Sequence, residues 1–161
     1  MGDWRKRIRG TRIIALLVLC LVSGLTDAWA EVYVNRKFGY SVDVPSDVFE
    51  ALPEEADGRA FVSRKDSDVR MRFFAASGVS KVPDAAQDDI PPGAEKVGVV
   101  LLDKGYLLRY RKDEVAFVLV RRLEGEVLYS ALFECPVGKT GDYDAICSAV
   151  LATWSLPEEN K

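Results

Sequence analysis

The stretch that decides the fold is residues 96–134, KVGVVLLDKGYLLRYRKDEVAFVLVRRLEGEVLYSALFE, in which extended apolar runs alternate with short polar turns. Runs of this length, rich in β-branched and aromatic residues and bounded by Asp, Lys and Gly, are typical of strands. We predict four of them, near residues 96–102, 105–111, 115–122 and 126–134. Links this short cannot carry a crossover, so consecutive strands must pair antiparallel and form a meander.

One helix is predicted after the meander, over residues 142–154. Its apolar residues recur with the spacing of a single helical face: Tyr143, Ile146, Cys147, Val150, Leu151 and Trp154. Asp142 lies in the first turn, where a carboxylate favours the positive end of the helix dipole, and Pro157 prevents continuation. We therefore expect this helix to pack its apolar face against the sheet.

The first half of the chain predicts further strands and one long loop. Alternation of apolar and polar residues predicts strands over residues 38–44, 59–63 and 69–73. Ser46-Asp47 is expected to cap a single helical turn through Val48 and Phe49. Residues 78–93 contain three prolines and are expected to form a surface loop or a lid.

The N-terminal 30 residues have the three-part pattern of a secretory signal peptide. A basic segment (Arg5 to Arg12) precedes the uncharged apolar run 13–22, and Ala28-Trp29-Ala30 is a small-x-small cleavage site. Cleavage after Ala30 would leave a single α+β domain, residues 31–161, with an antiparallel sheet of about six to seven strands and the C-terminal helix packed on it. The protein is then expected to be periplasmic or secreted. An uncleaved signal anchor is the alternative, and membrane attachment is expected only in that case.

Cysteine and histidine usage narrows the chemistry. Cys135 and Cys147 are the two cysteines of the mature chain, and in an oxidising compartment an even number predicts a disulfide. Two buried thiols are the alternative. The chain has no histidine, which excludes histidine metal sites and histidine-based nucleophile pairs. The acidic loops lack the twelve-residue calcium pattern, so we expect no catalytic residue, no metal site and no cofactor.

The charge of the mature chain argues against nucleic acid. The whole sequence has 22 basic and 25 acidic residues. Five of the basic and two of the acidic residues precede Glu31, which leaves a net charge of about −6. Six arginines occupy predicted strands that could be neighbours, and we consider them a candidate anion- or partner-binding face: Arg70, Arg72, Arg109, Arg111, Arg121 and Arg122. The alternative is a solvated surface in which they pair with acids such as Glu126 and Glu134.

Two segments resemble a group of small exported bacterial proteins of largely unknown function. Residues 38–49, FGYSVDVPSDVF, resemble the opening of that group, and residues 57–63, DGRAFVS, resemble the segment that follows it. The strand, proline and Asp142-Tyr143-Asp144 that lead the terminal helix are similar as well. The group is placed near the PsbP-like fold, that of the photosystem II extrinsic subunit and of a Ran-binding import factor. The resemblance implies an antiparallel sheet with helices against it, and it implies no reaction.

These observations predict a non-enzymatic binding or interaction module whose partner is an unknown protein or a component of the cell envelope. The first alternative is a carrier of small apolar ligands, with a pocket between sheet and helix roofed by residues 78–93. A histidine-free hydrolase ranks last.

Overall fold

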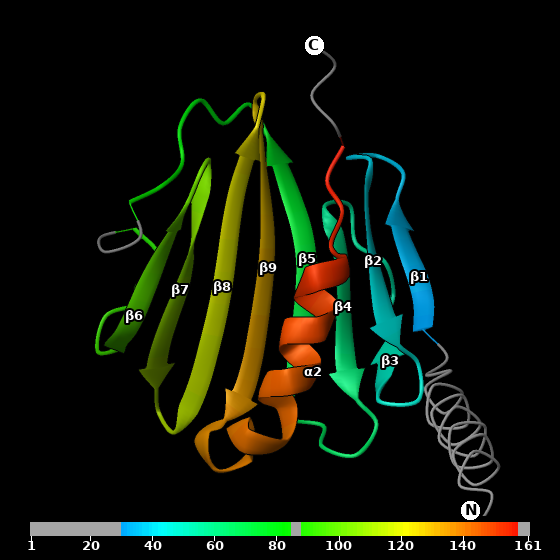
Figure 1. Cartoon of the computed structure of the whole chain (residues 1–161), viewed down its shortest axis with the longest axis vertical. Coiled ribbons are helices and arrows are strands. Elements are labelled where there is room, and N and C mark those ends of the chain that lie inside the picture. The colour runs from blue at the N-terminus through cyan, green and yellow to red at the C-terminus, as the bar shows by residue number, and fades with distance from the viewer. Residues whose placement is uncertain (1–29, 85–87, 158–161) are drawn as a thin grey trace, which may run out of the picture.

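The computed structural model describes residues 30–84 and 88–157, and the predicted signal peptide lies almost entirely outside them (Figure 1). Over the described residues the chain forms strands β1 (Ala30–Asn35), β2 (Tyr40–Pro45), β3 (Phe49–Ala51), β4 (Gly58–Ser63), β5 (Arg70–Ser77), β6 (Glu95–Leu102), β7 (Gly105–Lys112), β8 (Val115–Glu124) and β9 (Val127–Pro136). A 3-10 turn, η1 (Val137–Lys139), leads into helix α2 (Thr140–Thr153). The structure therefore has the α+β composition that the sequence predicts.

Seven strands form one antiparallel sheet in the order β3-β4-β5-β9-β8-β7-β6. The predicted meander β6 to β9 is confirmed, and each of its strands begins and ends within two residues of the predicted position. The last strand, β9, lies between β5 and β8 and so joins the two halves of the chain (Figure 1). Strands β1 and β2 pair only with each other and form a separate antiparallel ribbon.

Helix α2 lies on one face of the sheet, over the half that contains β4, β5 and β9 (Figure 1). Its buried residues Tyr143, Cys147 and Val150 belong to the main core, together with Phe73 from β5 and Phe133 from β9. We call the face that carries α2 the helix-side face and the opposite one the outer face. The predicted apolar stripe of the helix is thus what attaches it to the sheet.

The N-terminus of α2 is fixed by the turn that precedes β5. The Tyr143 hydroxyl donates a hydrogen bond to Asp66 Oδ2 at 2.7 Å. Lys139 Nζ lies 2.8 Å from Asp66 Oδ1, and its hydrogen bond, with that of Tyr143, lowers the pKa of the Asp66 carboxyl. These contacts fix where the helix begins on the sheet.

The β1–β2 ribbon is tied to the sheet by a buried polar network. The Tyr40 hydroxyl donates to the Phe73 carbonyl at 2.9 Å, and Asn35 Nδ2 donates to Tyr33 and Tyr40 at 3.2 and 3.4 Å. Burial is the main cause of the raised pKa of Tyr33. Because Ser41 and Ser155 also exchange backbone hydrogen bonds, the ribbon flanks α2 on the side away from β8 (Figure 1).

A second apolar cluster lies on the outer face of the sheet. It is formed by Tyr106, Leu108, Tyr110 and Leu119, and Val82, Ile90 and Ala94 pack against it. Residues 78–84 and 88–94, which we call the 78–94 segment, therefore cover the outer face. The expectation that this segment roofs a pocket between sheet and helix is wrong, because Leu108 and Leu119 face away from α2.

A second correction concerns Phe49. The chain turns at residues 46–48, where the Val48 N–H donates to the Pro45 carbonyl at 3.1 Å, but Phe49 is not part of a helical turn and begins the short strand β3, in which it pairs with Ser63 of β4. Phe49 is buried, and its ring packs against that of Tyr143 with centroids 6.3 Å apart. Pairing with β4 and this contact outweigh the weak local preference of Ser46-Asp47 for a helix cap.

Candidate binding surface

The helix-side face of β6, β7 and β8 is a part of the sheet that no described helix or strand covers. No described element crosses in front of these three strands (Figure 1). Register places a set of side chains there, because Val100 pairs with Leu107, Leu107 pairs with the core residue Val120, and Arg109 pairs with Val118. We call this surface the open half-face and define it by Val100, Leu107, Arg109, Arg111, Val118 and Arg122.

The floor of the open half-face is apolar. Leu107 and Val118 are only half-buried, and Val100 is 58% exposed. Side chains on the inner face of a sheet normally pack under a second layer. Here the second layer, α2, ends beside Val118, so these residues stay in contact with water.

The six predicted arginines do not form one face. Arg109, Arg111 and Arg122 share the helix-side face with core residues of β9. Arg70, Arg72 and Arg121 share the outer face with Leu132, Ser130 and Glu134. The prediction of a single arginine surface is therefore wrong, because neighbouring residues of a strand point to opposite faces.

Ion pairs further divide these arginines. Arg72 pairs with Glu55 at 2.6 Å and Asp57 at 3.1 Å. Arg122 lies 3.5 Å from Glu124. Arg109 and Arg111 are exposed and form no ion pair with any residue of the described ranges. The open half-face thus combines an apolar floor with two free guanidinium groups.

Arg121, on the outer face, belongs to a largely buried polar cluster that sequence reasoning missed. Its guanidinium contacts both carboxylate oxygens of Asp89, at 2.7 and 3.0 Å, and donates to Ser130 Oγ at 2.7 Å. The Tyr106 hydroxyl also donates to Asp89. Burial alone would raise the pKa of Asp89, but the hydrogen bonds from Arg121 and Tyr106 outweigh it and lower that pKa. This cluster holds the 78–94 segment on the sheet, and its charges are fully paired.

The sequence could identify two members of this cluster but not the third. Tyr106 and Arg121 lie opposite each other in the β7–β8 hairpin, which correct strand register would reveal. The partner carboxylate comes from residue 89, in a segment without periodicity, so nothing local identifies it. In the described parts of the chain no group of three His, Cys, Asp or Glu residues could hold a metal ion.

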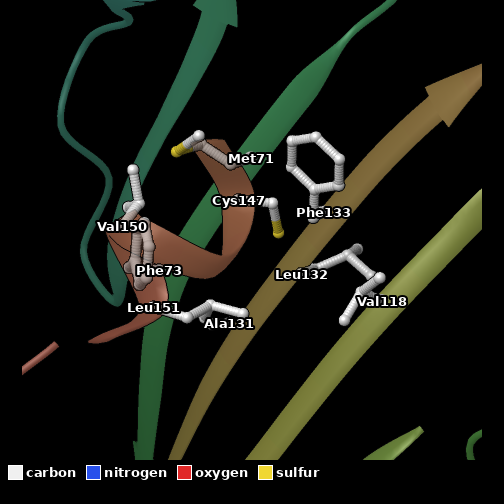
Figure 2. A pocket seen from close by; sticks show the side chains of 9 residues that line it. All are labelled: Met71, Phe73, Val118, Ala131, Leu132, Phe133, Cys147, Val150 and Leu151. Atoms are coloured by element: carbon white, nitrogen blue, oxygen red, sulfur yellow. The ribbon is translucent and has the colours of Figure 1, made fainter. Parts of the chain in front are cut away.

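A small apolar cavity lies between α2 and the sheet, at the border of the open half-face. Figure 2 shows Cys147 and Leu151 from α2 beside Ala131 and Phe133 from β9 and Val118 from β8. Its free volume is about 10 Å³, which is at the lower limit for one water molecule. Ligand pockets are usually about 300–1,000 Å³, so a carrier function would require α2 to move outward.

Cys135 and Cys147 are both buried and unbonded in the structure. Burial, followed by the charge of Asp144, raises the pKa of the Cys147 thiol to about 12. Burial also raises the pKa of Cys135. Thiols that stay protonated are poor nucleophiles, and the Cys135–Cys147 disulfide stays a prediction.

Comparison with known proteins identifies the fold. No family model and no curated protein matches the sequence. Among solved structures, the cyanobacterial PsbP protein CyanoP from Synechocystis sp. PCC 6803 superposes with a TM-score of 0.60 at 15% identity, over 83% of this chain and 96% of that one. A protein from Bacteroides thetaiotaomicron superposes with a TM-score of 0.56 at 13% identity, over 81% of this chain. This chain spans about half the length (50%) of the Bacteroides protein.

The similarity to CyanoP includes most of this chain and nearly the whole of that one. The antiparallel sheet that the resemblance implied is present, with α2 packed against it. Within the described ranges, no helix is long and apolar enough to cross a membrane. The described chain has the PsbP-like fold.

Proposed function

We propose that the protein is an exported, non-enzymatic module that binds another protein or an envelope component through the open half-face. The observation that carries this proposal is the juxtaposition of exposed Val100 and half-buried Leu107 and Val118 with the unpaired Arg109 and Arg111. Exposed apolar surface rimmed by polar groups is typical of interaction sites. Arginine next to apolar side chains is also enriched at protein interfaces.

Export is the second part of the proposal, and it is supported by the sequence of the first 30 residues. The basic segment, apolar run and Ala28-Trp29-Ala30 support a periplasmic or secreted location. Ala30 is the first residue of β1, where it pairs with Pro45, so cleavage after it would leave Glu31 to Asn35 free to form the ribbon. N-terminal sequencing of the protein recovered outside the cytoplasm should begin at Glu31.

Crosslinking in cells tests the binding surface. The full chain carrying an affinity tag would be crosslinked in the producing organism, captured and analysed by mass spectrometry, with the amount of each co-purified protein measured relative to the bait. We expect near-stoichiometric recovery of one partner, and its loss from the double variant Arg109→Glu, Arg111→Glu. Arg70→Glu is the matched control, because Arg70 is also an exposed strand arginine but lies on the outer face. Equal recovery with the double variant would contradict the proposal.

A carrier of small apolar ligands is the second candidate, since the cavity between α2 and the sheet is lined by apolar side chains such as Met71, Phe73 and Val150 (Figure 2). A fatty acid panel in a thermal unfolding assay tests it. A rise in Tm that Leu151→Trp abolishes would support the carrier, because the larger side chain would fill the cavity. Unchanged melting across the panel would reject it.

A further inference from the structure

We infer that the open half-face binds an amphipathic helix of a partner protein, one that carries two carboxylate side chains four positions apart. This inference rests on the proposed function and specifies the shape and charge of the partner.

The hydrogen bonding of the sheet selects a helix over an extended segment. β7 pairs with β6 and β8, and β8 pairs with β7 and β9, so the backbone groups of both strands are already engaged. The open half-face therefore offers side chains only. A partner segment that lies on it must satisfy its own backbone hydrogen bonds, and an α-helix does so within the segment.

The dimensions of the open half-face fit one helix. Neighbouring strands lie about 4.8 Å apart, so β6 to β8 span about 10 Å between the outer axes. That matches the 10–12 Å diameter of a helix with its side chains. α2 occupies the same layer over the neighbouring strands and runs roughly along them (Figure 1). A partner helix beside it would extend the helical layer across the sheet and cover Val100, Leu107 and Val118.

The two free arginines determine the charge of that helix. Docking any apolar surface over Leu107 and Val118 removes water from Arg109, and an unpaired charge that loses water is costly. A carboxylate on the partner offsets that cost. Arg109 and Arg111 are two positions apart on one strand face, a separation of about 7 Å. Residues four positions apart on a helix rise by about 6 Å, so two acidic residues at that spacing match the pair.

The edge of β6 is the competing surface. Leu101 is 81% exposed, and it lies on the outer face because it pairs with Tyr106. A partner strand added to this edge, including β6 of a second copy, would contact Leu101 as readily as Val100. These two adjacent residues therefore distinguish edge pairing from docking on the helix-side face.

Site-specific photocrosslinking in the full chain is the test. p-Benzoylphenylalanine would be placed at Val100 and, as matched control, at Leu101, and the crosslinked peptide of the partner would be identified by mass spectrometry. We expect a strong adduct from position 100 and a much weaker one from position 101. The captured peptide should have apolar residues at helical spacing and Asp or Glu at positions i and i+4. The adduct should be lost with Arg109→Glu and restored when one of those acidic residues is changed to Lys.

Other outcomes overturn the inference in distinguishable ways. Equal adducts from both positions would indicate strand pairing at β6, and an adduct with this chain itself would indicate a dimer. A captured peptide that is basic, or whose apolar and polar residues alternate as in a strand, would reject the acidic helix, and so would an adduct with lipid. If that protein or lipid adduct still required Arg109, the proposed function would stand although the inference had failed. No adduct from position 100, together with unchanged capture by the Arg109→Glu, Arg111→Glu variant, would reject both proposals.

Discussion

On the outer face of β6–β8, Leu108 and Tyr106 are buried beneath the 78–94 segment, whereas on the helix-side face of the same strands Val100, Leu107 and Arg109 stay in contact with water. The sequence of the strands alone does not produce this difference, since both faces carry leucine, valine and arginine. The two faces differ because different elements pack on them. A loop with a paired carboxylate closes the outer face, and α2 stops short on the other.

We call the covered outer face of β6–β8 the closed face, and we expect its stability to depend most on the ion pair between Asp89 and Arg121. Asp89→Ala leaves the Arg121 guanidinium buried without its carboxylate, and we expect the free energy of unfolding to fall by about 3–5 kcal/mol. Urea unfolding measures this loss. Arg72→Ala is the control, because its ion pairs are more exposed and should contribute less than about 1 kcal/mol. Equal losses for the two variants would show that the 78–94 segment is not held by Asp89.

Two adjacent leucines compare the faces directly. Leu108 is fully buried on the outer face, and Leu107 is half-buried on the open half-face. Leu108→Ala should lower the free energy of unfolding by about 2–5 kcal/mol through lost burial and the cavity it creates. Leu107→Ala should lower it by less than half of that, because water already reaches the side chain. Similar losses in denaturant titrations would mean that the open half-face is as well packed as the closed one.

The attachment of α2 sets the border of the open half-face, and the predicted disulfide would strengthen it. If Cys135 and Cys147 are bonded in the exported protein, closing that loop contributes about 2–3 kcal/mol to stability. Reductant should then lower the free energy of unfolding of the wild type by this amount and leave Cys135→Ser unchanged. A wild type that does not respond to reductant would show that the two buried thiols stay free.

Acidification should loosen the closed face first. The pKa of Asp89 is lower in the folded protein than in the unfolded chain. The ionised Asp89 therefore contributes its full stabilisation of the fold above about pH 4, the ordinary carboxyl range, and this contribution is lost as the pH falls through the lowered pKa. The difference in unfolding free energy between wild type and Asp89→Asn should therefore be constant near neutral pH and shrink in acid. Denaturant titrations across this range measure it, and a difference that grows in acid would have the wrong sign.

The smallest effect is expected at the open half-face itself. Arg111→Ala removes an exposed guanidinium without an ion pair among the described residues, so the free energy of unfolding should change by no more than about 0.5 kcal/mol. Partner capture should nevertheless fall. A stability loss above 1 kcal/mol in the same titration would indicate that Arg111 supports the fold and is not reserved for a partner.

Local pattern predicted most of the architecture. Two-residue turns such as Asp103-Lys104 fix which strands are neighbours, and the apolar spacing from Tyr143 to Trp154 fixes one helical face. The faces of the arginines were also within reach, because the consecutive residues Arg121 and Arg122 must point to opposite sides of β8. The contact of Asp89 with Arg121 was not, since it joins residues 32 positions apart through a loop without periodicity. The open half-face depends on where α2 ends on the sheet, which is a tertiary property.

The central position of β9 has a consequence for how the chain reaches its folded state. The hairpins from β6 to β8 can form as soon as they are synthesised, but β5 gains its β9 neighbour only through distant pairs such as Phe73 with Ala131. Pairings between segments so distant in sequence form slowly. The two halves of the sheet thus remain unjoined until nearly the whole polypeptide is available. If the protein is exported unfolded, as we propose, this order of events would keep it competent for translocation until its C-terminal part has been made.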